Sequence, residues 1–161
     1  MSGQLYFALI HSRINYGIQV YGSCTSKLRS KIQIVSNKLL KYLLKLPQRT
    51  PTNLLHKDLN ILKIDDLIDI NILCFVKKCM FDDCPELFKT YFRYQLHNYD
   101  TRDPKLYVKP SKTQMGSYSL KIKGASLWNN LETEIKSKCR LKSFKKCLTL
   151  RCISRYQTIE N

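Results

Sequence analysis

The sequence feature that most constrains the fold is an apolar repeat between Ser26 and Pro47. Six apolar side chains recur there at steps of three and four: Leu28, Ile32, Val35, Leu39, Tyr42 and Leu46. At about 100° per residue they form one narrow stripe on a helix. Ser26 is a residue type that caps a helix, and Pro47 cannot continue one. The pattern therefore predicts an amphipathic helix over residues 26–46.

A group of lysines accompanies this stripe, and we call it the lysine row. Its members are Lys27, Lys31, Lys38, Lys41 and Lys45. On the predicted helix they occupy an arc about 80° wide, and at about 1.5 Å rise per residue the ridge runs roughly 27 Å. That length suits contact with several successive phosphates.

The charge balance of the chain is strongly basic. Its 161 residues hold 28 Lys and Arg against 12 Asp and Glu, which gives a formal net charge of +16. No acid precedes Asp58, so the lysine row has no acidic neighbour in the sequence. This imbalance predicts a polyanionic partner, with nucleic acid first and an anionic membrane surface second. No apolar run approaches the about 18 residues of a membrane-spanning helix, and we expect no membrane partner.

The N-terminus and the cysteines bear on the compartment. The first ten residues lack a basic region, and no small-residue cleavage site follows them, so a secretory signal is not indicated. Seven cysteines are an odd number, which favours reduced thiols over a disulfide framework. We expect an intracellular protein in a nuclear or cytoplasmic ribonucleoprotein.

The rest of the chain favours a mainly α fold. Further helices are predicted over residues 5–15, 53–59, 65–81, 120–131 and 141–156, with Asp65 as the cap of the third. Strand-like alternation is confined to short pieces such as Tyr118 to Ile122. We expect a thumb-like helical region at 1–96, a Pro- and Lys-rich connecting loop at 97–119, and a basic helical segment at 120–161.

Two further basic segments are candidates for nucleic-acid contact. In the last predicted helix, Lys142, Lys145 and Lys146 flank an apolar stripe of Leu141, Phe144, Leu148 and Cys152. Between Tyr91 and Lys109, basic residues including Arg102 alternate with aromatic ones, a composition that stacks on unpaired bases and holds phosphates. A solvated loop with its aromatic rings in the core explains this second segment equally well.

Catalytic and metal-binding patterns are weak. Asp65-Asp66 and Asp82-Asp83 are adjacent carboxylates of the kind that holds Mg²⁺ in polymerases, but both pairs fall at predicted helix ends. No two cysteines stand at C-x2-C spacing, and the three histidines are scattered. We therefore predict no catalytic residue, no metal site and no cofactor in this chain.

Several segments together resemble one family. They are Leu5-Tyr6-Phe7-Ala8-Leu9-Ile10, Ile14-Asn15-Tyr16-Gly17-Ile18, Leu59-Asn60-Ile61-Leu62, His97-Asn98-Tyr99-Asp100-Thr101-Arg102, and Gly124-Ala125-Ser126-Leu127-Trp128-Asn129-Asn130-Leu131 with Phe144-Lys145. In order and spacing they resemble the C-terminal region of reverse transcriptases from non-LTR, jockey-type retrotransposons, over about residues 4–155.

The resemblance implies a thumb-like region downstream of the fingers and palm. The catalytic aspartates, and the Mg²⁺ they bind, would then lie in an upstream palm, and this chain would be inactive alone. Its expected partners are RNA or an RNA·DNA hybrid, and in the parent protein its own palm domain. Two alternatives stay open: an inert relic of a decayed element, and an unrelated basic structural protein of a ribonucleoprotein particle.

Overall fold

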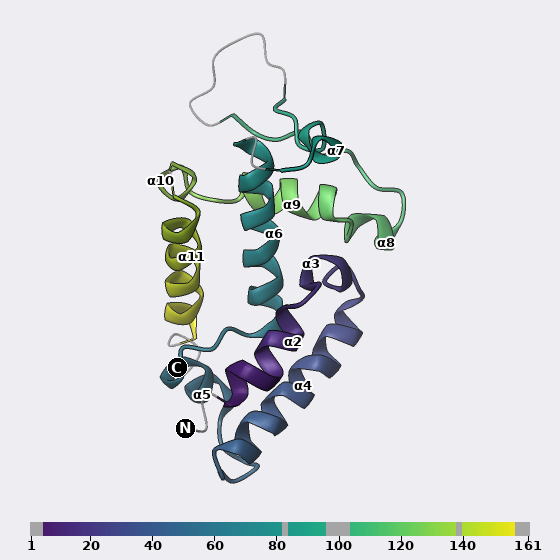
Figure 1. The fold of residues 1–161 in the computed structure, drawn as a ribbon. Coiled ribbons are helices and arrows are strands. Elements are labelled where there is room, and N and C mark those ends of the chain that lie inside the picture. The colour runs from purple at the N-terminus through teal and green to yellow at the C-terminus, as the bar shows by residue number, and fades with distance from the viewer. Residues whose placement is uncertain (1–4, 82–83, 96–103, 138–139, 157–161) are drawn as a thin grey trace. The chain divides into compact units, whose positions relative to one another are not determined.

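The computed structural model describes residues 5–81, 84–95, 104–137 and 140–156. Its elements, shown in Figure 1, are η1 (Tyr6–His11), α2 (Ser12–Asn15), α3 (Ile18–Tyr21), α4 (Ser26–Leu43), α5 (Thr52–Asp58), α6 (Ile64–Met80), α7 (Glu86–Lys89), α8 (Gln114–Ser117), α9 (Leu120–Asn129), α10 (Thr133–Lys136) and α11 (Leu141–Arg155). The first of these is a π-helical stretch.

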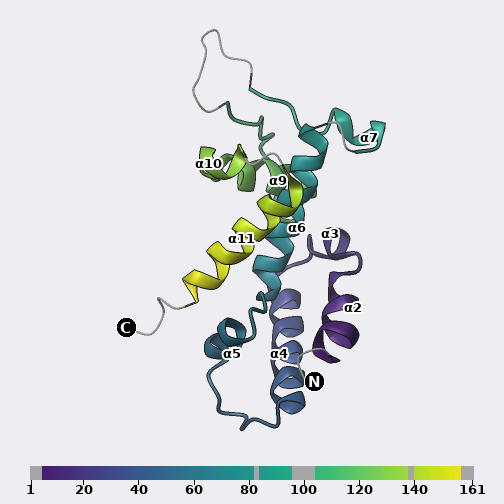
Figure 2. The same ribbon diagram turned by 60° about the vertical axis from the view of Figure 1, so that its left-hand side comes forward.

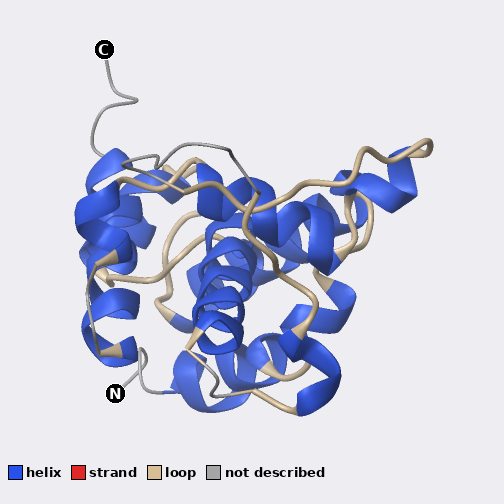
Figure 3. Ribbon diagram, turned by 90° about the horizontal axis from the view of Figure 1, so that it is seen from above, coloured by secondary structure: helices blue, strands red, loops and turns tan. Residues whose placement is uncertain are grey.

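The mainly α class is confirmed. Within the described ranges Figure 3 shows helices and loops only, and the extended pairing they contain is an isolated bridge between Tyr94 and Leu106. The short alternation at Tyr118–Ile122 forms no strand: Ser119 is the N-cap of α9, which begins at Leu120 as the predicted helix does. None of the helices described is both long and apolar enough to cross a bilayer.

The chain divides into two compact units by its internal contacts. One unit comprises Met1–Ile68 with Thr149–Asn161, and the other comprises Asp69–Leu148. The boundaries fall inside α6 and α11, so each of these helices contributes residues to both units. The three-part division predicted from composition rests on a different criterion and stays a prediction.

The core of the first unit forms where the N-terminal helical segment lies alongside α4, as Figures 1 and 2 both show. Tyr6, Leu40, Leu55 and Ile61 are buried together, and partly buried leucines from the end of α4 pack against them. Burial of four such side chains contributes on the order of 1.5–3 kcal/mol each.

A network of hydrogen bonds joins the buried side of α4 to neighbouring segments of the same unit. The Gln33 side-chain oxygen accepts a hydrogen bond of 2.6 Å from the backbone N–H of Ile64, and its amide nitrogen donates to Asn37 at 2.7 Å. His56 on α5 is buried, with Nδ1 donating to the Ile61 carbonyl at 3.0 Å. The hydroxyls of Tyr6 and Ser36 are 2.8 Å apart. These bonds satisfy polar groups that burial removes from water.

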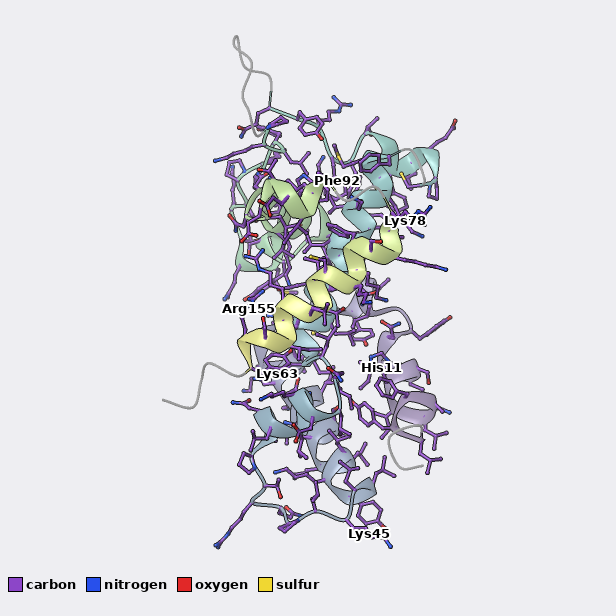
Figure 4. All side chains as sticks on the ribbon, turned by 90° about the vertical axis from the view of Figure 1, so that its left-hand side faces the viewer. His11, Lys45, Lys63, Lys78, Phe92 and Arg155 are labelled. Carbon is purple, nitrogen blue, oxygen red and sulfur yellow. The ribbon has the colours of Figure 1, made fainter. Side chains whose placement is uncertain are left out.

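The C-terminal end of α11 is anchored to the start of α6 in this first unit. The hydroxyl of Tyr156 donates to a carboxylate oxygen of Asp66 and accepts a hydrogen bond of 3.0 Å from the Lys63 backbone N–H. The Lys63 ammonium lies 4.7 Å from the centre of the Tyr156 ring, and Figure 4 shows Lys63 close to this end of α11.

The second unit has a core of apolar side chains from α6, α9 and α11. Val76, Trp128 and Phe144 are buried there, together with Leu148 from the predicted apolar stripe of α11. Cys152, the last member of that stripe, is also buried but belongs to the first unit. The approach of α9 to α6 depends on Gly124, where a Cβ atom would lie 2.9 Å from a methyl carbon of Val76. This contact explains why the Gly–Ala–Ser–Leu–Trp segment begins with the smallest residue.

Candidate nucleic-acid interface

Helix α4, which carries most of the lysine row, is shorter than predicted. Thr25 rather than Ser26 is its N-cap, and the helix ends at Leu43. After it, Leu46 N–H donates to the Lys41 carbonyl at 2.9 Å and Lys45 N–H donates to the Tyr42 carbonyl at 3.1 Å. This is a Schellman motif, with Lys45 in the left-handed conformation at φ 53°. The helix therefore stops before Pro47, and Lys45, labelled in Figure 4, stands beyond its last turn.

The lysine row faces away from the core. Lys27, Lys31, Lys38 and Lys45 are exposed, whereas Ser36 and Leu40, roughly on the opposite side of α4, are buried. Among the residues that the structure describes, none of these four lysines makes an ion pair or a side-chain hydrogen bond. Their charges are therefore available to an external anion.

Lys41 differs from the other members of the row. It is half-buried, and its ammonium donates a hydrogen bond of 2.6 Å to the backbone carbonyl of Gln48. With Lys38, Asn37 and Tyr42 it lines a partly polar cavity of about 320 Å³ at the C-terminal end of α4. From Lys27 to Lys41 the helix rises only about 21 Å, so the ridge is shorter than the sequence predicts.

Two aspartates of α6 form ion pairs with basic residues outside the lysine row. Asp65 lies 3.1 Å from Arg29, and Asp69 lies 2.6 Å from Lys123. The start of α6 at Ile64 places Asp65 and Asp66 in its first turn, so the prediction that Asp65 caps the helix is wrong. In this position the two negative carboxylates also interact favourably with the positive N-terminal end of the helix dipole.

The apolar stripe of α4 is largely exposed. Leu28, Val35 and Tyr42 keep 49, 56 and 81% of their surface. Beside the stripe an apolar groove of about 420 Å³ runs between α4 and the η1–α2 segment, lined by Leu9, Ile14, Val35 and Leu39. Arg13 and Lys31 are the two cations along it. The helix thus buries its Ser36–Leu40 side rather than its most regular apolar face.

The remaining candidate residues lie in the second unit or outside the described residues. Lys142, Lys145 and Lys146 are exposed on the first turns of α11. Arg102 lies outside the described residues. Sequence reasoning did not single out Lys77, which is buried on α6 with its ammonium 3.1 Å from the Lys136 carbonyl and 4.6 Å from the Phe144 ring centre. Because Lys77 is buried, its ammonium cannot reach a phosphate in solution. No pattern in the sequence indicates that this lysine is buried.

The described residues offer little for catalysis. No group of three potential metal-ligating side chains comes together among them. Burial raises the pKa of the Cys74 thiol, and burial with a hydrogen bond to Cys84 raises the pKa of Cys79 to about 12. Thiols shifted in this direction are poor nucleophiles at neutral pH. The exposed ammonium groups of α4 present positive charge to solvent.

Comparison of the chain with protein-family models, curated proteins and solved structures finds no match. The resemblance to non-LTR reverse transcriptases therefore stays a prediction carried by the residues quoted above.

Proposed function

We propose that this chain binds RNA or an RNA·DNA hybrid through phosphate contacts, without reading the base sequence. The observation that carries the proposal is the set of exposed lysines on one side of α4, which have no ionic partner in the described structure. A net charge of +16 supplies long-range attraction for the same class of ligand. The exposed lysines at the start of α11 add a second basic surface.

The mechanism is electrostatic. Each lysine that neutralises a phosphate releases a condensed counterion, so affinity falls by about 0.7 to 0.9 log units per contact for each tenfold rise in salt. Lys27 and Lys31 are one turn apart and Lys38 is two turns further, which places the three charges over about 16 Å along the axis. Such a spacing suits contact with separate phosphates of one strand or duplex.

The experiment compares two triple variants with the same net charge. Lys27→Glu, Lys31→Glu and Lys38→Glu together remove six charge units, which takes the chain from +16 to +10. Arg49→Glu, Lys57→Glu and Lys112→Glu form the control, since they make the same change at scattered positions. Binding of a labelled RNA·DNA hybrid is measured by fluorescence anisotropy across a salt series.

We expect the α4 variant to lose most of its affinity and its salt slope to flatten by about 2 to 3. The scattered variant should keep the slope of the natural chain. Equal losses in both variants would show that net charge alone attracts the hybrid, and unchanged affinity in the α4 variant would overturn the proposal.

The proposed origin is the C-terminal part of a non-LTR retrotransposon reverse transcriptase without its catalytic palm. This origin rests on the resemblance of the segments quoted above, and it assigns no catalytic residue to the chain. Reading the bases upstream of the start codon tests it: a frame encoding an aromatic residue followed by x-Asp-Asp supports this origin. An unrelated upstream frame would favour the basic ribonucleoprotein protein instead.

The exposed apolar stripe of α4 favours a second candidate, an inert relic that lacks its packing partner. A monomeric chain rarely leaves so much contiguous apolar surface in water unless another surface covers it. The relic and the RNA-binding module differ in whether the isolated chain unfolds cooperatively.

A further inference from the structure

A short antiparallel pairing in the second unit has a regular hydrogen-bond pattern. Tyr94 forms an antiparallel bridge with Leu106. Tyr107 N–H donates to the Arg93 carbonyl and Gln95 N–H donates to the Lys105 carbonyl, both at 2.8 Å. Opposed residues in such a pairing project to the same side, and neighbours along the chain alternate. Arg93, Gln95, Lys105 and Tyr107 thus share one side, and Leu106 lies on the other.

The pairing is fixed to the core by α9. Leu106 is fully buried, its N–H donates to the Asn129 side-chain oxygen at 2.7 Å, and its carbonyl accepts from the Asn129 amide at 2.9 Å. Phe92, next to Arg93, is also buried and lies against Gly124. The backbone beneath the shared side is therefore held in place before any ligand binds.

The shared side itself is open. Tyr107 keeps 54% of its surface, and Arg93 and Lys105 are exposed. Within the described ranges none of these three side chains has a hydrogen bond or an ion pair. We call Arg93, Lys105 and Tyr107 the basic-aromatic face.

We infer that the basic-aromatic face binds single-stranded nucleic acid, with one base stacked on Tyr107 and the adjoining phosphates held by Arg93 and Lys105. The inference rests on the proposed function and specifies its ligand further. A duplex hides the faces of its bases, whereas a single strand presents them to an exposed ring. Arg93 lies opposite Tyr107 and Lys105 lies two residues before it on the same side, so both cations adjoin the ring where the phosphates next to a stacked base would pass.

The test uses two fluorescein-labelled RNA probes of about 12 nucleotides, within the range of known single-strand sites. One is oligouridine, and the other has the same backbone with abasic residues. Tyr107→Ala should weaken binding of oligouridine about tenfold and leave binding of the abasic probe unchanged, since only a base can stack on the ring. Tyr107→Phe should keep the affinity.

A matched control and a charge variant complete the design. Tyr16→Ala removes another tyrosine, 85% exposed in the first unit, and should change neither affinity. Arg93→Ala with Lys105→Ala should weaken both probes and reduce the salt slope by about 1.4, which is two single-strand contacts.

The outcomes separate this inference from the proposed function. Equal affinity of Tyr107→Ala and the natural chain for oligouridine overturns the inference, and the proposed function survives if the α4 triple variant still loses binding. Equal loss of both probes in Tyr107→Ala also overturns it, because the ring would then support structure rather than stack on a base. If the natural chain binds neither RNA probe and does not bind the RNA·DNA hybrid, the inference and the proposed function are both overturned.

Discussion

Lys45 adopts a backbone conformation that stability alone does not favour. Its φ of 53° closes the Schellman motif at the end of α4, a position where glycine is usual. The same motif ends α5, where Ile61 N–H donates to the His56 carbonyl at 2.8 Å and Asn60 has φ 52°. Asparagine tolerates this region because its short side chain bonds locally, but lysine does not. Lys45 therefore costs the fold stability that glycine at this position would not.

Replacing Lys45 by glycine should therefore stabilise the fold. We expect Lys45→Gly to raise the free energy of unfolding by about 1 kcal/mol in urea denaturation, since the side chain is exposed and its strain is removed. Asn60→Gly is the matched control and should gain less. If Lys45 holds a phosphate, the stabilised variant should also lose about one contact from the salt slope. Lower stability of Lys45→Gly would show that the side chain makes a contact the fold needs.

His56 is buried, and both of its ring nitrogens face oxygen atoms, although a neutral imidazole has only one N–H to donate. A neutral ring donates from one nitrogen, and here Nδ1 donates to Ile61 while Nε2 lies 2.9 Å from the Asn37 side-chain oxygen. Burial is the largest influence and lowers the pKa of His56. The Ile61 carbonyl and Asp66 act in the opposite direction, and Lys63 adds to the lowering.

Acid should accordingly destabilise the first unit. The unfolded ring takes up its proton near pH 6.5, and the folded ring does so only at lower pH, so between the two values the unfolded state holds more protons. The free energy of unfolding should fall as the pH drops below about 6.5. His56→Gln should remove this part of the pH dependence in parallel urea titrations. A natural chain that gains stability in acid would show that both ring nitrogens donate and that the network favours the charged ring.

At the scale of the elements, the contact between α9 and α6 is sensitive to volume at Gly124. A side chain there would meet Val76 at 2.9 Å and the Phe92 ring at 3.2 Å. We expect Gly124→Val to lower the free energy of unfolding by about 2–3 kcal/mol through overpacking. Ser126→Val, at an exposed position of the same helix, should change it by less than about 0.5 kcal/mol. Similar effects of both variants would mean that valine's helix propensity, not the contact, decides stability.

Long helices were predictable from sequence because their signals are local. The predicted spans for residues 120–131 and 141–156 match α9 and α11 within about two residues, and residues 53–59 match α5 within one. The one-turn helices α3, α7 and α10 have too few residues for a periodic pattern, so nothing in the sequence distinguishes them from turns. The alternation at Tyr118–Ile122 is equally short, and Ser119 within it caps the N-terminus of α9.

Burial of α4 was harder to predict than its helical state. The most regular apolar positions, Leu28, Val35 and Leu39, remain exposed, and the buried side carries Gln33, Ser36 and Asn37 beside Leu40. Polar side chains at these positions read as a solvated face. Ser36 is buried and Gln33 and Asn37 are half-buried, because Tyr6, Ile64 and His56 provide hydrogen-bond partners for them. These partners are distant in sequence, so the pairings depend on tertiary structure.

On the scale of the whole molecule, the distribution of charge was the property best predicted from the sequence. The absence of acids before Asp58 is a property of the sequence, and within the described residues the exposed lysines of α4 have no ionic partner. Three aspartates of α6, at 65, 66 and 69, contact Arg29, Tyr156 and Lys123 instead. Which lysines face solvent was less predictable. Lys41 turns to the Gln48 carbonyl only because the chain reverses after Lys45, and that reversal has no glycine to signal it.

Unfolding of the whole chain should be a single cooperative event. Helices α6 and α11 each supply residues to both compact units, so melting one unit breaks backbone hydrogen bonds of helices that continue into the other. Calorimetry should therefore give one transition with equal calorimetric and van't Hoff enthalpies. Gly124→Val, in one unit, and His56→Gln, in the other, should shift that same transition. Two transitions would show that the units unfold separately, and a broad melt without a peak would favour the relic, whose apolar stripe on α4 awaits a missing partner.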